Sequence, residues 1–116
     1  MARYVIAMGA HAMDAVPDSD LPAVADAAHA VCREAITAGV FVVSGGIVDA
    51  PSSVVAPDGT VTSGARPDAL GGFAIVEVPS RDEARRWAAR FAAACRCAQE
   101  VWEVSPDPEL DEMLGA

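Results

Sequence analysis

The sequence predicts a small α+β domain of the βαββαβ order, with one extra hairpin, that pairs its sheet with the sheet of a second copy. Three observations support this prediction: the length of the chain, the order of its strand and helix patterns, and two strands that are apolar on both faces. A chain of 116 residues is one domain by length, and a hydrophobic content of 53% is ample for a packed core.

The first half of the chain begins with a strand and continues with a helix. Residues 3–8 are a short apolar run rich in strand formers. After a loop, Ser19 and Asp20 are candidate N-caps, and Pro22 in the first turn is typical of a helix start. Apolar residues then recur at steps of three and four, and Gly39 predicts the end of this helix.

The second half alternates strands with a hairpin and a helix. Ser80 and Glu83 form a capping box, which predicts the start of the second helix. The predicted elements are a strand over 40–43 ended by residues 44–46, hairpin strands over 53–56 and 60–62, a strand over 73–78, a helix that runs on to residue 98, and a last strand over 101–104. Two helices on one side of an antiparallel sheet, in this order, make a ferredoxin-like fold.

The last residues form a separate feature. Residues 1–104 make up the single domain, and residues 105–116 are a Pro-containing acidic tail that we expect to be mobile or to lie across the surface. The second predicted helix carries five arginines together with two acidic residues, which is most simply a solvated face. These arginines can also meet the acidic tail, and the tail can also serve as a module for binding a partner.

Two central strands predict the oligomer. A sheet with helices on one face and water on the other should alternate apolar and polar residues. The strands over 40–43 and 73–76 do not alternate, so something apolar must cover the second face. The chain has no elements left for this task, and a homodimer through the sheet face is the simplest solution.

The charge excludes two classes of partner. The chain has 17 acidic and 8 basic residues, which gives a formal net charge of −9, and every basic residue is an arginine. This charge repels phosphate backbones and anionic membrane surfaces. We therefore expect no nucleic acid and no membrane as a partner.

The cysteines and the chain start indicate a cytoplasmic protein. The odd set of Cys32, Cys95 and Cys97, without a signal peptide or a transmembrane segment, favours reduced thiols. With two histidines and no CxxC motif, we predict no metal site, and we assign no cofactor.

The sequence contains two histidines, and only the first of them is a catalytic candidate. His11 and Asp14 follow the first strand, where His11 can act as a general base and Asp14 can fix its tautomer. The alternative is a solvated loop histidine that lies near an acid by chance. His29 lies off the apolar stripe of the first helix, so we expect an exposed or edge position for it, without a catalytic role.

Three further residues are candidate ligand-binding groups. Arg66 presents a planar fork that suits a carboxylate or a phosphate, with Asp68 beside it. The alternative for this pair is a loop salt bridge of little energetic weight. Ser44 can offer a hydroxyl to the same pocket, whereas Gly45 and Gly46 are more simply a turn or bulge requirement.

The order and spacing of several short motifs resemble the YCII-related family, and within it the DGPF-type branch. The residues that carry the resemblance lie at 38–40, 45–46, 61–64, 70–73, 75, 77–84, 87–89 and 103–104. The resemblance covers roughly residues 4–104 and implies the dimeric α+β barrel fold.

The chain departs from this family in several places, and two of them bear on function. Where the family usually reads Asp-Gly-Pro-Phe, residues 63–66 read Ser-Gly-Ala-Arg. Some members are thought to use a His and an Asp of the first helix as a catalytic pair. Here His29 falls near the His position but not on it, and Thr37 occupies the Asp position, so the pair does not carry over.

Two functions remain open from the sequence. The first is a small-molecule enzyme of lyase or isomerase style, with a pocket at the edge of the sheet, and this interpretation rests on analogy with the family. The second is a non-catalytic ligand-binding or accessory protein, which the loss of the signature and of the His–Asp pair favours. The sequence assigns neither the substrate nor the reaction.

Overall fold

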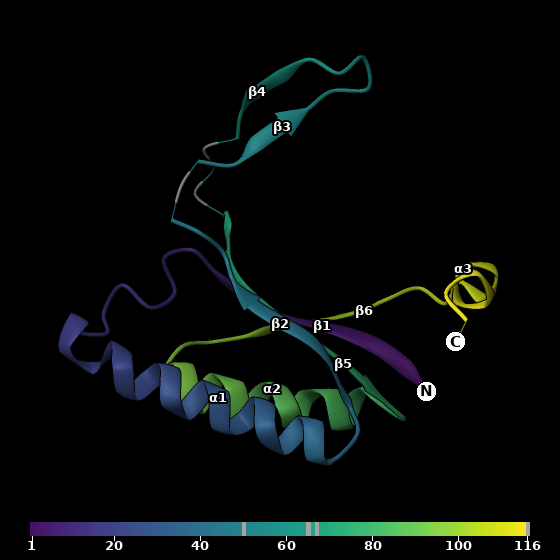
Figure 1. The fold of residues 1–116 in the computed structure, drawn as a ribbon. Helices are drawn as coiled ribbons and strands as arrows, with labels where there is room; N and C mark the ends of the chain where they lie inside the picture. Colours follow the sequence, from purple (N-terminus) through teal and green to yellow (C-terminus); the bar gives the residue numbers. More distant parts are fainter. Residues whose placement is uncertain (50, 65, 67, 116) are drawn as a thin grey trace.

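A computed structural model describes residues 1–49, 51–64, 66 and 68–115, and Ala65 of the altered signature lies outside them. The described residues form a four-stranded antiparallel sheet in the order β2-β5-β1-β6, with two helices on one face (Figure 1). The elements are β1 (Ala2–Gly9), η1 (Asp18–Asp20), α1 (Leu21–Thr37), β2 (Phe41–Gly46), β3 (Ser53–Val55), β4 (Val61–Ser63), β5 (Leu70–Val78), α2 (Arg81–Cys95), β6 (Glu100–Glu103) and α3 (Pro108–Met113). The predicted ferredoxin-like plan is confirmed.

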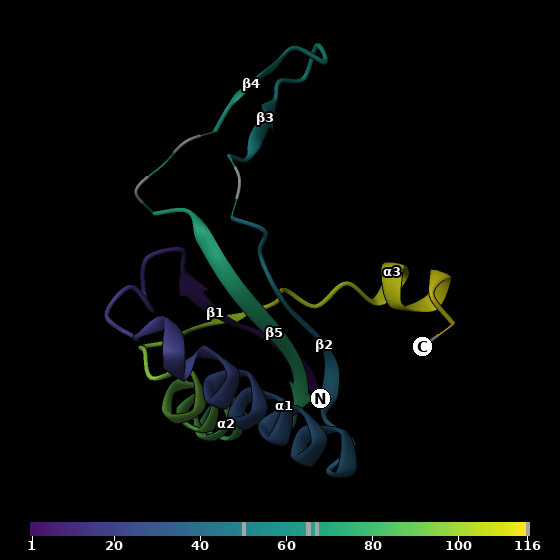
Figure 2. The same cartoon turned by 60° about the vertical axis from the view of Figure 1, so that its left-hand side comes forward.

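The helical layer and the sheet enclose the core. Helices α1 and α2 lie side by side beneath the strands (Figure 2). Alternate residues of β1 and β5 point toward them, and Ile6, Val76 and Val78 are the largest side chains that are fully buried. An ion pair between Glu34 and Arg90 joins the outer faces of the two helices. The buried core of the domain is therefore the helix-facing side of its sheet.

The other face of the sheet carries an apolar row. The strand register places Val43 beside Ile75, Ile75 beside Val5, and Val5 beside Trp102, so one row crosses all four strands. Val43 is 42% exposed and Trp102 is 59% exposed. We call the face that bears this row the open face. The non-alternating pattern of the strands predicts an apolar second face, and the open face is apolar.

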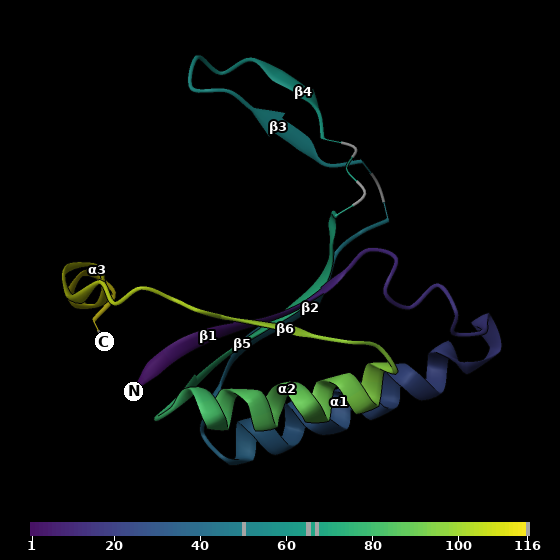
Figure 3. The ribbon, with the colours of Figure 1, turned by 180° about the vertical axis from the view of Figure 1, so that it is seen from behind.

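Two segments project from the domain on the side of the open face. Strands β3 and β4 form a two-stranded sheet of their own, as the sequence predicts, and it stands away from the main sheet (Figure 3). At its turn, Gly59 has a φ of +88°, which suits a residue without a Cβ, and the Asp58 carboxylate accepts a hydrogen bond from the Thr60 N–H. The acidic tail contains the short helix α3, which also stands off the domain (Figure 1).

Several predicted boundaries are wrong. Strand β2 continues through residues 44–46 instead of ending there, because Gly45 and Gly46 pair with residues of β5, which itself begins at Leu70. Helix α2 ends at Cys95, where Arg96 adopts the left-handed conformation with a φ of 57°. The helix therefore stops three residues before the predicted end, with a non-glycine cap that the sequence does not announce.

The predicted start of α1 is confirmed in position and corrected in its chemistry. Helix α1 begins at Leu21 with Asp20 as the N-cap residue, but the Asp20 side chain makes no capping hydrogen bond. Its carboxylate accepts a hydrogen bond of 2.8 Å from Arg96. In contrast, the Ser80 hydroxyl does cap α2, because it accepts from the Glu83 N–H at 3.2 Å. Asp20 thus links the start of α1 to the end of α2.

Replacing Gly71 by alanine should lower the free energy of unfolding by about 1–3 kcal/mol, because the new Cβ would collide with the backbone of Gly9. Urea unfolding followed by circular dichroism measures this change. Gly46→Ala is the matched control, since a Cβ there meets nothing within 4 Å, and its stability should stay the same or rise slightly. Equal losses in both variants would contradict the close approach of Gly71 to Gly9.

Candidate functional site

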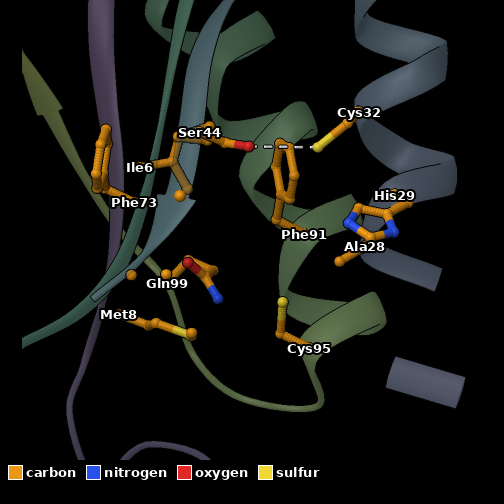
Figure 4. Close-up of a pocket in the computed structure, with 14 residues that line it drawn as sticks. Ile6, Met8, Ala28, His29, Cys32, Ser44, Phe73, Phe91, Cys95 and Gln99 are labelled. Atoms are coloured by element: carbon orange, nitrogen blue, oxygen red, sulfur yellow. Dashed lines mark hydrogen bonds between the residues drawn. The ribbon is translucent and has the colours of Figure 1, made fainter. Parts of the chain in front are cut away.

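A cavity of about 270 Å³ lies between the two helices and the sheet (Figure 4). This volume exceeds the roughly 150 Å³ cavity that holds a benzene molecule, and it lies just below the usual range of ligand sites. It therefore fits a one-ring compound or a molecule of similar size. The described residues that line it are Ile6, Met8, Ala28, His29, Cys32, Ser44, Gly45, Gly46, Gly72, Phe73, Ala74, Phe91, Cys95 and Gln99.

Two glycines of neighbouring strands, Gly46 and Gly72, leave room for the cavity on the side of the sheet. Gly45 and Gly46 of β2 pair with Phe73 and Gly72 of β5. A Cβ at Gly72 would lie 2.9 Å from the Met8 Cε, so a side chain there would displace a wall of the cavity. In Figure 4 the Phe73 ring lies on the far side of the strands from Phe91, which leaves mainly backbone on the cavity side. The glycines that the sequence suggests as a turn are thus the floor of the cavity.

One wall of the cavity brings together three reactive side chains. His29 and Cys32 are three residues apart on α1, a spacing that places both on the same face of a helix. Ser44 of β2 faces them, and its Oγ lies 3.5 Å from the Cys32 Sγ, the contact dashed in Figure 4. The remaining walls are mostly apolar, so these groups form a distinct polar edge.

A sulfur-rich contact lies at the end of the cavity that Met8 and Gln99 line. The Cys97 thiol lies 3.5 Å from the Met8 Sδ, to which it donates, and Gln99 Nε2 donates to the Cys97 sulfur at 3.6 Å. Burial raises the pKa of Cys97, although the hydrogen bond from Gln99 acts in the opposite direction. These contacts fix the turn after α2, so that Gln99 reaches the cavity.

The Cys95 thiol is held in its neutral form. Burial is the main cause that raises its pKa, and the neighbouring Cys97 and Cys32 add to the shift because they disfavour a second negative charge. A thiol with a raised pKa is a poor nucleophile at neutral pH. Cys95 therefore serves as a wall of the cavity rather than as a reacting group.

The two catalytic candidates from the sequence, and two of its three ligand-binding candidates, lie elsewhere. His11 Nδ1 and Asp14 Oδ2 are 3.0 Å apart, but the two side chains are 74% and 68% exposed. Arg66 donates two hydrogen bonds of 3.1 Å to Asp68, again in an exposed loop, and the pairing raises the pKa of Arg66 and lowers that of Asp68. None of these four is among the described residues that line the cavity.

The structure nevertheless brings the two exposed pairs to one end of the sheet. The Ala10 N–H donates to the Ala69 carbonyl at 2.8 Å, which joins the loop of His11 to the loop of Arg66. Of the predicted site residues, Ser44 alone is among the described residues of the cavity wall. His29 is exposed at the edge of the cavity, as the sequence predicts. Sequence reasoning gave neither His29 nor Cys32 a place in the site, although their shared helical face was the available signal.

Two negative findings apply to the residues that the structure describes. Within them, no three His, Cys, Asp or Glu side chains are placed to hold a metal ion. No helix in this part of the chain combines the length and the apolar character that crossing a bilayer requires.

The rate at which iodoacetamide alkylates Cys95 should rise with pH. The pH at which this rate is half of its maximum should be higher in the folded protein than in the unfolded chain. The physical reason is that burial raises the pKa of Cys95 and removes the reactive thiolate. Peptide mass spectrometry at several time points between roughly pH 7 and 10 measures the rate in folded and urea-unfolded protein. Identical midpoints in the two states would contradict the buried, neutral thiol.

Comparisons with known proteins place the chain in a family. The family model described as YCII-related domain matches residues 3–106. Among solved structures, a 5-chloro-2-hydroxyhydroquinone dehydrochlorinase from Burkholderia phenoliruptrix, in complex with 2,5-dihydroxybenzoquinone, is similar with a TM-score of 0.48 and 18% identity, over 91% of this chain and 96% of that one. A search of the curated proteins finds no match. The DGPF-type branch stays a prediction, but the chain belongs to the YCII-related domain family.

Proposed function

We propose that the protein is a homodimeric small-molecule enzyme of lyase or isomerase type, which works in the cavity between α1, α2 and the sheet. The observation that carries the proposal is the convergence of His29, Cys32 and Ser44 on one edge of an otherwise apolar cavity. A mostly apolar pocket with a few convergent polar groups is the usual form of a small-molecule site.

Each polar group has a role that its chemistry suits. The His29 imidazole is the proton-transfer group, because a ring nitrogen of histidine can accept a proton and give it back. The hydroxyl of Ser44 and the amide of Gln99 orient an oxygen atom of the substrate from two sides. The Cys32 thiol, at 3.5 Å from the Ser44 oxygen, holds that hydroxyl in place. The substrate is a small, mostly apolar molecule with one or two oxygen functions.

The residues of the cavity wall favour an uncharged substrate. Among its described lining residues there is no Asp, Glu, Lys or Arg. A buried charge without a partner would be costly there, so a carboxylate or a phosphate is disfavoured in the deep part of the cavity. The same observation supports the second candidate function, a binding protein for a neutral ligand, in which no proton transfer takes place.

The exposed loops at the end of the sheet offer a different site. Here His11 is the general base, Asp14 fixes its tautomer, and Arg66 with Asp68 binds a charged group of the ligand. The 3.0 Å contact between His11 and Asp14 supports this assignment. The high exposure of both side chains weakens it, because water screens their charges and competes for the substrate. His29 is exposed as well, so the cavity ranks first on the enclosure that its other, mostly apolar lining residues provide and not on burial of its histidine.

The homodimer accounts for the open face. The row of Val43, Ile75, Val5 and Trp102 is continuous across the sheet, and a second copy covers it with the same row. The radius of gyration is 15.8 Å, above the roughly 13 Å of a compact chain of this length. The projecting segments and the apolar sheet face both support the proposed dimer.

A thermal-shift screen of small uncharged ring compounds is the first test of the cavity. A ligand that binds only the folded protein raises its apparent melting temperature. Ala28→Trp places a large side chain at a residue of the cavity wall and should abolish the shift. A compound that stabilises this variant as much as the wild type binds elsewhere.

With a substrate from that screen, His29→Gln should lower kcat by about 100-fold or more, because the proton-transfer group is lost while the shape is kept. Steady-state kinetics of His29→Gln, His11→Gln and the surface control Arg86→Gln measure the effect. Loss of activity in His11→Gln, with His29→Gln unaffected, would move the site to the exposed loops. Binding without turnover in the wild type would favour the ligand-binding function.

Ile75→Asp should raise the dissociation constant of the dimer by at least about tenfold, because it places an unpaired charge in the centre of the covered face. Analytical ultracentrifugation at several concentrations measures it, and circular dichroism checks the fold. Ile36→Asp is the matched control, since Ile36 is 59% exposed on α1, in the helical layer. A wild type that stays monomeric at high concentration would refute the dimer.

A further inference from the structure

We propose that, in the dimer, the β3–β4 hairpin of one subunit clasps helix α3 of the other. We call residues 51–64 the hairpin and residues 105–115 the arm. The inference rests on the proposed dimer and adds a second interface to it. The two segments have neither been assigned a role above nor been given a partner within their own subunit.

The hairpin needs a partner for its apolar surface. Its residues Val54, Val55 and Val61 are 48%, 65% and 62% exposed. An isolated two-stranded hairpin is marginally stable in water, and three or more strands or a covering helix are usually required. A helix with an apolar face is therefore the kind of element that this hairpin lacks.

The arm also has an apolar surface that lacks a partner within the described part of its own subunit. Helix α3 has six residues, and isolated helices of this length do not persist in water without packing. Leu110, Met113 and Leu114 lie at the spacing of one helical face and are 46%, 71% and 64% exposed. The match to the YCII-related family model ends at residue 106, so this helix lies outside the matched residues.

The positions of the two segments fit a two-fold dimer. Both project on the side of the open face, away from α1 and α2, and they rise from opposite ends of the sheet (Figures 1 and 3). A two-fold axis that lies between the two sheets and runs across the strands exchanges those ends. The hairpin of each subunit then lies over the arm of the other, and the two contacts are equivalent.

Charge favours this axis over the alternative one. A two-fold axis along the strands would bring arm against arm and hairpin against hairpin. The arm carries four acidic residues, so two adjacent arms would repel each other. Within residues 51–64 the only charged residue of the sequence is Asp58, at the turn. A nearly uncharged hairpin can contact the apolar face of α3 while the acidic residues stay in water.

Disulfide trapping between two single variants tests the pairing. Val55→Cys and Leu110→Cys subunits are mixed, allowed to exchange and oxidised with diamide, and the products are mapped by mass spectrometry. We expect a cross-linked peptide pair that joins position 55 to position 110 in the mixture. A 55–55 product from the first variant alone, or a 110–110 product from the second alone, would overturn the clasp.

A binding measurement keeps the test independent of cross-linking geometry. The double variant Leu110→Asp, Met113→Asp should raise the dissociation constant of the dimer by at least about tenfold, while Glu109→Gln, Glu112→Gln on the polar side of α3 leaves it unchanged. A dimer unaffected by the first variant refutes the clasp and leaves the dimer standing. A monomeric wild type refutes both.

Discussion

The structure depends on a sheet whose two faces are both apolar. Alternate residues of the central strands supply both surfaces, and the domain covers only one of them with its helices. Small side chains let the helices pack closely on the sheet. Ala84 of α2 is fully buried and Ala88 nearly so, which lets α2 approach the strands. The hydrophobic effect acts on the open face with the same strength per area, and this is the physical basis of the dimer that we propose.

The cavity is a second consequence of small residues. Gly46 and Gly72 leave the cavity side of the sheet without side chains where their strands pair. A well-packed core would fill this space, because empty volume forfeits dispersion contacts. Here the space is bordered instead by a histidine, a serine and thiols. Such unfilled space lowers stability, so a functional role is the better explanation for a cavity with polar groups at its edge.

The sequence predicts the architecture well and the site poorly, for physical reasons. Element order, the S-x-x-E cap at Ser80 and the hairpin turn at Gly59 are local signals, and the structure bears them out. The continuation of β2 through its glycines depends on pairing with β5, which is a long-range contact that local patterns do not encode. For the same reason His11 and Asp14, three residues apart in the sequence, are easier to notice than His29 and Ser44, which only the fold brings together.

The two faces of the sheet are coupled through the strands that they share. Ser44 points toward the cavity, while Gly45, the next residue, lies against Phe73, with the site of its missing Cβ 3.7 Å from the ring. The register places Phe73 beside Ala7, in the row next to Ile75 on the open face. A partner subunit that packs on this face would press on Phe73, and through Gly45 on the backbone that carries Ser44. In the proposed dimer, subunit packing and the shape of the cavity are therefore linked through one strand, although they use opposite sides of the sheet.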